Sequence, residues 1–286
     1  MITVKANKNN IFSQIARLCF MIVLALIFLF PFFVMVSQGF MTWEEVSDIP
    51  VKLLPSKINF DNYKAVMNPE FFTYFKNTLF VIGMNVIFVP LSGYIVAYGF
   101  SKIRFVGYSF FFSIGMATIM IPSIACTVPL YVLYSKLGWL NTLLPFVIPQ
   151  MFGGGMMNIF LMMQFLKGVP NTYVEAAKLD GASELKTALR IVAPLCVPVI
   201  TLIMVNTFIG VWNDFTGPLT YIAEDCSEKF TMAVAMYRRY ANKVYADEKR
   251  PNEQAALCMI LMIPTLVLFG FFQKSLINGV SLSGLK

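Results

Sequence analysis

Histidine is absent from this 286-residue sequence, and charged residues make up only 13% of it. Without imidazole, the chain has no histidine metal ligand, no serine–histidine hydrolytic pair and no histidine proton relay. The pattern Gly-x-x-x-x-Gly-Lys-Ser/Thr, which cradles nucleotide phosphates, does not occur either. The five cysteines form no Cys-x-x-Cys pair, and their spacing indicates no disulfide framework. We therefore expect no catalytic role, no metal and no cofactor site in this chain.

Hydrophobic residues dominate instead. They make up 58% of the chain, and its mean hydropathy is +0.70. Six apolar runs are long enough, at about 20 residues each, to cross the hydrocarbon core of a bilayer. They lie near residues 15–37, 78–98, 109–132, 143–165, 194–216 and 256–276. The sequence predicts an all-α polytopic membrane protein, in which residues 1–286 form one bundle of six transmembrane helices.

The segments between these runs indicate an orientation. An even number of spans places both termini on one side of the membrane. If that side is the cytoplasm, 11 Lys and Arg residues lie inside and 11 outside, so their count alone does not decide. The inner segments are shorter, and long loops weigh less in the positive-inside rule. The outer loops, 39–77 and 217–255, also carry 11 acidic residues against 3 inside. We therefore expect both termini in the cytoplasm. The net charge of +7 does not indicate nucleic-acid binding, because no nucleic-acid motif accompanies it.

One charged segment, residues 168–193, separates the fourth and fifth apolar runs. Thr172 and Glu175 are three residues apart, which is the spacing of a capping box at the start of a helix. Gly181 can adopt a positive φ and end that helix, and Ser183 can cap a second one. The segment therefore predicts a helix, a sharp turn and another helix, with small residues at the turn that let another surface approach closely.

The residues of this segment resemble the EAA loop of the membrane subunits of ATP-binding-cassette (ABC) importers. The matching residues are Glu175, Ala176, Ala177, Asp180 and Gly181, followed at the family's spacing by Ile191 and Pro194. The sequence departs from the pattern at Ala193, where the family more often has Leu. In that family the loop docks onto the ATPase subunits, so the resemblance implies a cytoplasmic coupling loop at 168–193. An amphipathic connector that lies on lipid headgroups is the alternative.

Polar residues near the end of the fifth run form a second candidate site. The run Trp212-Asn213-Asp214-Phe215 resembles a segment of the sugar-transporting members of this family. A carboxylate at the bilayer centre costs about 2.5–3.5 kcal/mol on insertion scales, so Asp214 should face protein or water. One interpretation places these residues along a substrate pathway. The other places the helix end at the membrane surface, with Trp212 in the aromatic belt and Asp214 in solvent.

Amides within the apolar runs are weaker candidates. Asn206 can belong to the same pathway, but hydrogen bonds between helices, worth about 0.6–2 kcal/mol, also explain both Asn206 and Asn85. In the fourth run, Gly153, Gly154 and Gly155 favour close helix packing or a kink.

Over nearly its whole length, the sequence is similar to the shorter permease subunit of a carbohydrate ABC importer of the maltose-permease type. The resemblance rests on the six apolar runs, the EAA loop, the Trp-Asn-Asp-Phe run and the terminal Ser-Leu-Ser-Gly-Leu-Lys. It implies import of a sugar or oligosaccharide across the bacterial cytoplasmic membrane. It also implies a second homologous permease subunit, two ATPase subunits that bind ATP and magnesium, and an extracytoplasmic solute-binding protein.

Two other functions stay open. The chain can be an ABC import permease for a solute that is not a sugar, or a secondary transporter that works without ATP. A secondary transporter typically has inverted repeats or several charges within the membrane. The sequence shows no convincing internal repeat, and Asp214 is its one candidate charge.

Overall fold

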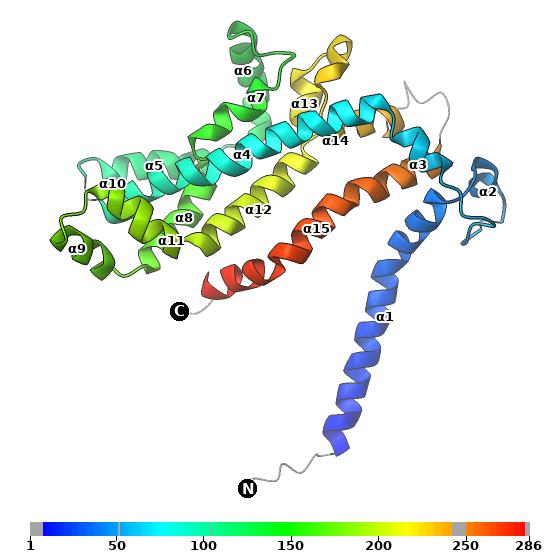
Figure 1. Ribbon diagram of the computed structural model, residues 1–286, viewed down its shortest axis with the longest axis horizontal. Coiled ribbons are helices and arrows are strands. Elements are labelled where there is room, and N and C mark those ends of the chain that lie inside the picture. Colours follow the sequence, from blue (N-terminus) through cyan, green and yellow to red (C-terminus); the bar gives the residue numbers. More distant parts are fainter. Residues whose placement is uncertain (1–7, 51, 104, 242–249, 284–286) are drawn as a thin grey trace. The chain divides into compact units, whose positions relative to one another are not determined.

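Helices are the only regular secondary structure that the described residues adopt (Figure 1), which confirms the predicted all-α class. The structure is a computed structural model, and it describes residues 8–50, 52–103, 105–241 and 250–283. Within the domain expected over residues 1–286, contacts define two compact units. The first unit contains residues 1–68 and 247–263, and the second contains residues 69–246 and 264–286.

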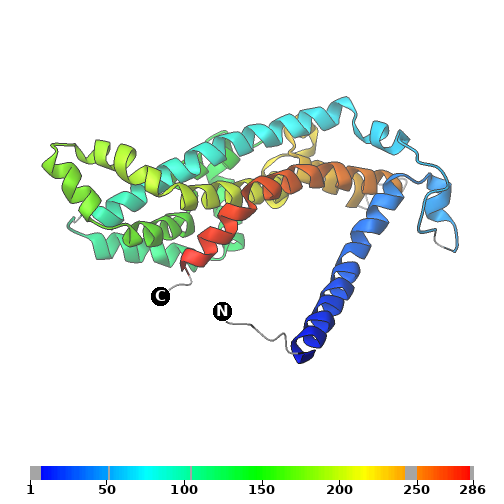
Figure 2. The same cartoon turned by 60° about the horizontal axis from the view of Figure 1, so that its bottom comes forward.

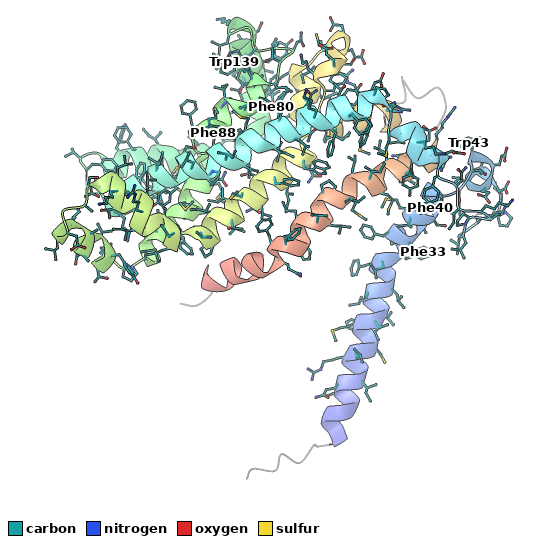
Figure 3. All side chains as sticks on the ribbon, viewed as in Figure 1. Phe33, Phe40, Trp43, Phe80, Phe88 and Trp139 are labelled. Carbon is teal, nitrogen blue, oxygen red and sulfur yellow. The ribbon has the colours of Figure 1, made fainter. Side chains whose placement is uncertain are left out.

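The first unit is built on α1 (Lys8–Gly39), α2 (Trp43–Ser47), α3 (Asp61–Val66) and the beginning of α15 (Pro251–Ser283). Residues 14–33 of α1 are all exposed, as suits an apolar helix in a bilayer. After α1, contacts between side chains hold the chain in place. The ring of Phe40, labelled in Figure 3, packs on the ring of Tyr63, with the two ring centroids 5.1 Å apart. A buried asparagine pair, Asn252 Nδ2 to Asn62 Oδ1 at 2.8 Å, fixes α15 to α3.

A complete capping box begins α2. The Thr42 N–H donates to Glu45 Oε2 at 3.0 Å, and the Glu45 N–H donates to Thr42 Oγ1 at 3.4 Å. Glu45 also accepts hydrogen bonds from Ser56, and these, together with the bond from Thr42, lower the pKa of Glu45 to about 2. The carboxylate therefore stays ionised, and able to hold the turn, over the whole physiological pH range.

The second unit is organised around α4 (Pro69–Lys102), which is about 51 Å long at 1.5 Å per residue. It packs along α12 (Val197–Asn213) and α8 (Met156–Gly168), and the three helices lie together in Figures 1 and 2. Their interface is a core of buried apolar side chains that also includes Cys196: Val89, Tyr94, Ala97, Met162, Met163, Leu166, Val199 and Ile203.

The remaining helices of this unit are shorter. They are α5 (Tyr108–Ile119), α6 (Ser123–Lys136), α7 (Leu144–Val147), η1 (Pro149–Phe152), α9 (Thr172–Leu179), α10 (Glu184–Lys186), the π-helix η2 (Thr187–Val192), α11 (Ala193–Leu195), α13 (Thr216–Tyr221), η3 (Glu224–Lys229), α14 (Met232–Met236) and the π-helix η4 (Tyr237–Ala241).

Four described helical segments are long and apolar enough to cross a membrane: Ser13–Gly39, Pro69–Lys102, Leu144–Gly168 and Pro251–Gln273. Two pairs reach that length only together and are bent, Tyr108–Ile119 with Ser123–Lys136 by 101°, and Glu184–Leu195 with Val197–Asn213 by 78°. The number of crossings in the described residues is therefore four, or up to six if each bent pair is one span. Each of the six ranges expected from the sequence overlaps one of these segments or pairs.

Prolines account for both bends. Pro122 immediately precedes α6, where it offers no N–H and keeps Ile121 out of the helical region. In the second pair, Pro194 and Pro198 flank the break at Cys196, and Pro198 lies in the first turn of α12, where proline is tolerated. The prolines thus divide two apolar runs that length alone would make single straight helices.

The three glycines before α8 bring this helix close to α4. Gly153, Gly154 and Gly155 have φ of 94°, 62° and 94°, a region that side chains with a Cβ rarely adopt. A Cβ at Gly154 would lie 2.4 Å from Cγ1 of Val89. The close packing predicted for this glycine run is confirmed, and the chain also breaks there between η1 and α8.

Candidate functional site

The charged segment between α8 and α12 forms a compact loop at the C-terminal end of α4 (Figure 1). Its first helix, α9, ends at Leu179, and Gly181 follows with φ of 73°. The Ser183 hydroxyl then accepts a hydrogen bond from the Lys186 N–H at 3.4 Å and caps α10. The positive φ predicted for Gly181 and the cap predicted for Ser183 are both confirmed.

The capping box predicted for Thr172 and Glu175 is wrong. Asn171 is the residue that precedes α9, its backbone is already helical at φ −68° and ψ −18°, and no side chain caps the helix. The Asn171 side chain is engaged elsewhere, because its Oδ1 accepts a hydrogen bond from Lys102 Nζ at 2.9 Å. Thr172 becomes the first helical residue, and Glu175 is exposed on the outer face of α9.

Three side chains of α4 hold this loop in place. Tyr94, Tyr98 and Lys102, called here the α4 ladder, lie four residues apart and therefore on one helix face. Their partners in the loop are, in that order, the Ala188 carbonyl oxygen at 2.6 Å, the Glu184 carboxylate at 3.3 Å and the Val169 carbonyl oxygen at 2.6 Å. Lys178 adds an ion pair to Glu184 at 2.7 Å. The loop is thus fixed to α4 along two turns of that helix.

The outer face of the loop is open to a partner. Glu175, Ala176, Asp180 and Gly181 are exposed, whereas Ala177 is only 2% exposed because it packs inward. Leu179 is 89% exposed at the end of α9. The exposed turn of small residues leaves room for another surface to approach Leu179 closely.

A cavity of about 640 Å³ lies within the second unit. Its walls come from α4, α6, α7, η1, α8, α12, α13 and the chain around them. The polar lining consists of hydroxyl and amide groups and one carboxylate: Asn85, Ser123, Thr127, Tyr134, Gln150, Asn158, Asn206, Thr207, Asn213, Asp214, Thr216, Thr220, Tyr221 and Thr231. Among the described lining residues there is no Lys or Arg.

Asp214 is placed in this cavity by the end of α12. It is the residue that follows the last turn, and its Oδ1 accepts a hydrogen bond from the Gly217 N–H at 3.0 Å. The neighbouring Asn213 donates from Nδ2 to the Ile209 carbonyl oxygen at 2.9 Å, which leaves its Oδ1 available. Asn206 lies two turns earlier on the same side of α12 and also lines the cavity.

Two buried side chains that line the cavity have polar atoms without partners. Asn85 is 1% exposed; its Nδ2 donates to the Phe146 carbonyl oxygen at 2.9 Å, and its Oδ1 has no partner among the described residues. Thr231 is 4% exposed, and its hydroxyl likewise has none there. Such atoms usually pair with water or a ligand.

The family description "Binding-protein-dependent transport system inner membrane component" matches residues 90–281. That range contains the loop and most of the residues that line the cavity. The chain belongs to this family. Its members are inner membrane components by definition, so the protein is a permease subunit whose transport depends on a binding protein.

Full-length relatives of this permease support the assignment. It is 24% identical to the inner membrane ABC transporter permease protein YcjP of Escherichia coli (strain K12), over 98% of this chain and 99% of the relative. It is 25% identical to the trehalose/maltose transport system permease protein MalG of Thermococcus litoralis, over 98% of this chain and 99% of the relative. A chain from the crystal structure of a bacterial ABC transporter involved in the import of the acidic polysaccharide alginate has the same fold, with a TM-score of 0.83 and 23% sequence identity. The match covers 95% of this chain and 99% of that chain.

The structure brings together three of the four pathway residues expected from the sequence. Asn206, Asn213 and Asp214 line the cavity of the permease, and Trp212 does not. Trp212 is 7% exposed. Its ring packs on the rings of Phe208 and Phe75, with centroid separations of 5.8 Å and 6.2 Å. Its place on the pathway stays a prediction that this cavity does not support, and Trp212 is not exposed as an aromatic-belt residue would be.

Several residues of the permease escaped sequence reasoning. The α4 ladder is one such set, and Thr231 is another such residue. A signal for the ladder exists, because two tyrosines and a lysine at spacing four at the end of an apolar helix can reach polar partners together. Thr231 carries no such signal, since only the folded chain places it beside α4.

Proposed function

We propose that this permease is a membrane subunit of a carbohydrate ABC importer in the bacterial cytoplasmic membrane. The family match over residues 90–281 carries the proposal. The relatives add support for the substrate, since one is named for trehalose and maltose and a structural neighbour for an alginate importer. A cavity lined by hydroxyl and amide groups is suited to a ligand with many hydroxyls.

The complete importer contains a second, homologous permease, two ATPase subunits and an extracytoplasmic solute-binding protein. ATP and magnesium bind to the ATPases. The termini of this chain and its coupling loop, residues 168–193, lie on the cytoplasmic side with them. The exposed face of the loop, formed by Glu175, Ala176, Asp180, Gly181 and Leu179, is the docking surface.

The α4 ladder supports a mechanical role for the loop. Moving a two-state pathway from 1:99 to 99:1 requires about 5.5 kcal/mol of differential interaction. An exposed salt bridge contributes about 0–1 kcal/mol, so ion pairs at the loop surface are insufficient. A loop seated in the ATPases and fixed to α4 moves that helix as a rigid body, and α4 carries Asn85, about 20 Å along its axis from Tyr98, into the cavity wall.

Gly181 provides the test of docking. Its φ of 73° strains any side chain, but an added Cβ meets nothing within 4 Å in this chain. Gly181→Ala and Gly181→Leu therefore share the backbone strain and differ only in bulk that points outward. We expect the Leu variant to lose stoichiometric ATPase subunits on affinity purification, and sugar uptake with them, well beyond the Ala variant. Equal ATPase recovery and uptake in the two variants contradicts docking at this turn.

The substrate class is tested in cells. Deleting the gene should abolish uptake of at least one of the labelled trisaccharides maltotriose, arabinotriose and trigalacturonate, and the intact gene should restore it. Unchanged uptake of every saccharide, with loss of uptake of another solute, supports an ABC permease for a solute that is not a sugar. Saccharide uptake by the lone reconstituted chain without ATP supports a secondary transporter.

A further inference from the structure

We propose that the chain between α1 and α3 rests on the bilayer and inserts apolar side chains into its headgroup layer. Residues 40–50 and 52–60 are called here the α1–α3 segment. The inference goes beyond the proposed function and is independent of the solute, because it requires only that α1 crosses the membrane. Both α1 and the segment belong to the first unit.

The apolar length of α1 sets the level of the membrane surface. Residues 18–36 form a run of 19 residues without a charge, hydroxyl or amide side chain. At 1.5 Å per residue this run is about 29 Å long, which is close to the thickness of the hydrocarbon core, about 30 Å. Arg17 and Ser37, which flank the run, therefore lie near the two edges of the core. A tilt of α1 brings Ser37 further into the bilayer rather than out of it.

Hydrogen bonds hold part of the α1–α3 segment at that level. The Ser37 hydroxyl donates to the Leu53 carbonyl oxygen at 2.6 Å. The Asn59 N–H donates to the Phe40 carbonyl oxygen at 3.1 Å, one residue beyond the end of α1. Residues 53–59 are therefore held beside the end of α1, at the edge of the hydrocarbon core.

The side chains of this held stretch are largely apolar and exposed. Ile58 is 70% exposed, Leu54 65%, Phe60 58% and Leu53 52%. Single exposed apolar residues are common on protein surfaces, but a group of four within eight residues marks a contact with a membrane or another protein. Trp43, labelled in Figure 3, is 47% exposed, and tryptophan is enriched at membrane interfaces. Because irregular backbone does not enter hydrocarbon, the apolar side chains alone reach it.

Charge does not account for such a contact. The α1–α3 segment carries three carboxylates, Glu44, Glu45 and Asp48, and two lysines, Lys52 and Lys57. Lys52 Nζ is already paired with Asp48 Oδ2 at 2.7 Å. A slightly negative segment is not attracted to anionic headgroups, so burial of apolar surface has to supply the contact. The segment therefore differs from a polybasic membrane anchor, and salt should not release it.

Photo-crosslinking in intact cells identifies what covers the segment while every natural partner is present. The photoreactive residue benzoylphenylalanine replaces Ile58 or Leu54, and mass spectrometry identifies the adducts on the purified permease. We expect phospholipid adducts at both positions, at about half or more of the yield at Phe28, a 70% exposed residue of α1. Asp225, an exposed residue of η3, is the control for a position in water and should give at least tenfold fewer lipid adducts.

A matched pair of variants tests the apolar character of the contact. Ile58→Asp and Lys57→Asp place the same carboxylate at adjacent exposed positions, and only the first removes an apolar side chain. We expect Ile58→Asp to lower the lipid adducts at Leu54 at least threefold, and Lys57→Asp to leave them unchanged. Lipid adducts at Phe28 should be the same in both variants, since α1 stays inserted. Illumination of membrane vesicles in high salt should give the same yields as in low salt.

Protein adducts in place of lipid adducts at Ile58 and Leu54 overturn the proposal, because a partner subunit or the solute-binding protein then covers the segment. Lipid yields as low as those at Asp225 overturn it as well, since the segment then faces water. Equal effects of the two Asp variants, or loss of the lipid adducts in high salt, contradict a contact made by apolar side chains. Saccharide uptake is measured separately, so none of these outcomes alters the proposed function.

Discussion

Leu179 is the most exposed apolar side chain of the coupling loop, at 89%. Because it contacts little of its own chain, Leu179→Ser should change the free energy of unfolding by less than about 0.5 kcal/mol. If the side chain fills a pocket of an ATPase subunit, the same change should lower ATPase association at least tenfold. Affinity purification followed by quantification of the bound ATPase measures this. Full recovery of ATPase from the Ser variant excludes Leu179 from the interface.

A substitution at Glu175 distinguishes a contact with a partner subunit from a contact within this chain. Its carboxylate has no hydrogen-bond or ion-pair partner among the described residues, and the capping box that would have occupied it does not form. Glu175→Gln should therefore leave the fold intact. If an ATPase Arg or Lys binds the carboxylate, removing the charge costs about 2–5 kcal/mol of association. ATPase binding titrations compare this variant with Glu70→Gln, an exposed change at the other end of α4 that should have no effect.

At the scale of elements, we expect that breaking one bond of the α4 ladder loosens the loop and leaves the helix bundle folded. Tyr94→Phe leaves the Ala188 carbonyl oxygen without its donor at 2.6 Å, an unpaired buried group that costs about 1–3 kcal/mol. Trypsin should then cut faster at the exposed Lys178 and Lys186 than in the unsubstituted protein. Tyr131→Phe, an exposed tyrosine of α6, is the control. Identical cleavage rates in both variants mean that the bond does not hold the loop.

The crossing of α8 over α4 offers a second matched pair. Gly154→Ala places a Cβ 2.4 Å from Cγ1 of Val89, whereas at Gly155 the new Cβ meets nothing within 4 Å. Both positions have positive φ, so both variants carry backbone strain. Gly154→Ala should be less stable than Gly155→Ala by about 1–3 kcal/mol, the usual cost of overpacking. Thermal inactivation in detergent measures the difference, and a smaller side chain at Val89 should reduce it.

Local patterns predicted the elements better than their tertiary roles. Apolar length located each run, and Gly181 and Ser183 identified the turn, because these features depend on neighbouring residues. The capping box at Thr172 was wrong because α9 already begins at Thr172, and the residue before it, Asn171, has a helical backbone. Trp212 does not line the cavity with the other three residues, and helical spacing explains the difference. Asn206 and Asn213 are seven residues apart and share a face, and Trp212 lies about 100° away from it. Asn85 was a candidate from its sequence alone, whereas the position of Thr231 in the cavity lining required the folded chain.

At the scale of the whole molecule, transport depends on the connection between the loop and the cavity. The cavity and the loop are on one unit and share α4, so a change in the loop position reaches the cavity wall through a single helix. ATP binds to other chains in the proposed importer. The reconstituted permease pair without ATPases should accordingly show no saccharide accumulation against a gradient, and adding the ATPases, binding protein, ATP and magnesium should establish it.

Orientation is the last property that the whole chain predicts. The loops 39–77 and 217–255 carry 11 acidic residues, against 3 in the inner segments, and the coupling loop must reach ATP-bound subunits. Alkaline phosphatase, which is active only outside the cytoplasm, should therefore be active when fused after Ser56 or Ser227. It should be inactive when fused within the loop after Lys186. A green fluorescent protein that matures only in the cytoplasm should fluoresce at either terminus. Phosphatase activity after Lys186 would place the loop outside, away from any ATPase, and the coupling assignment would have to be abandoned.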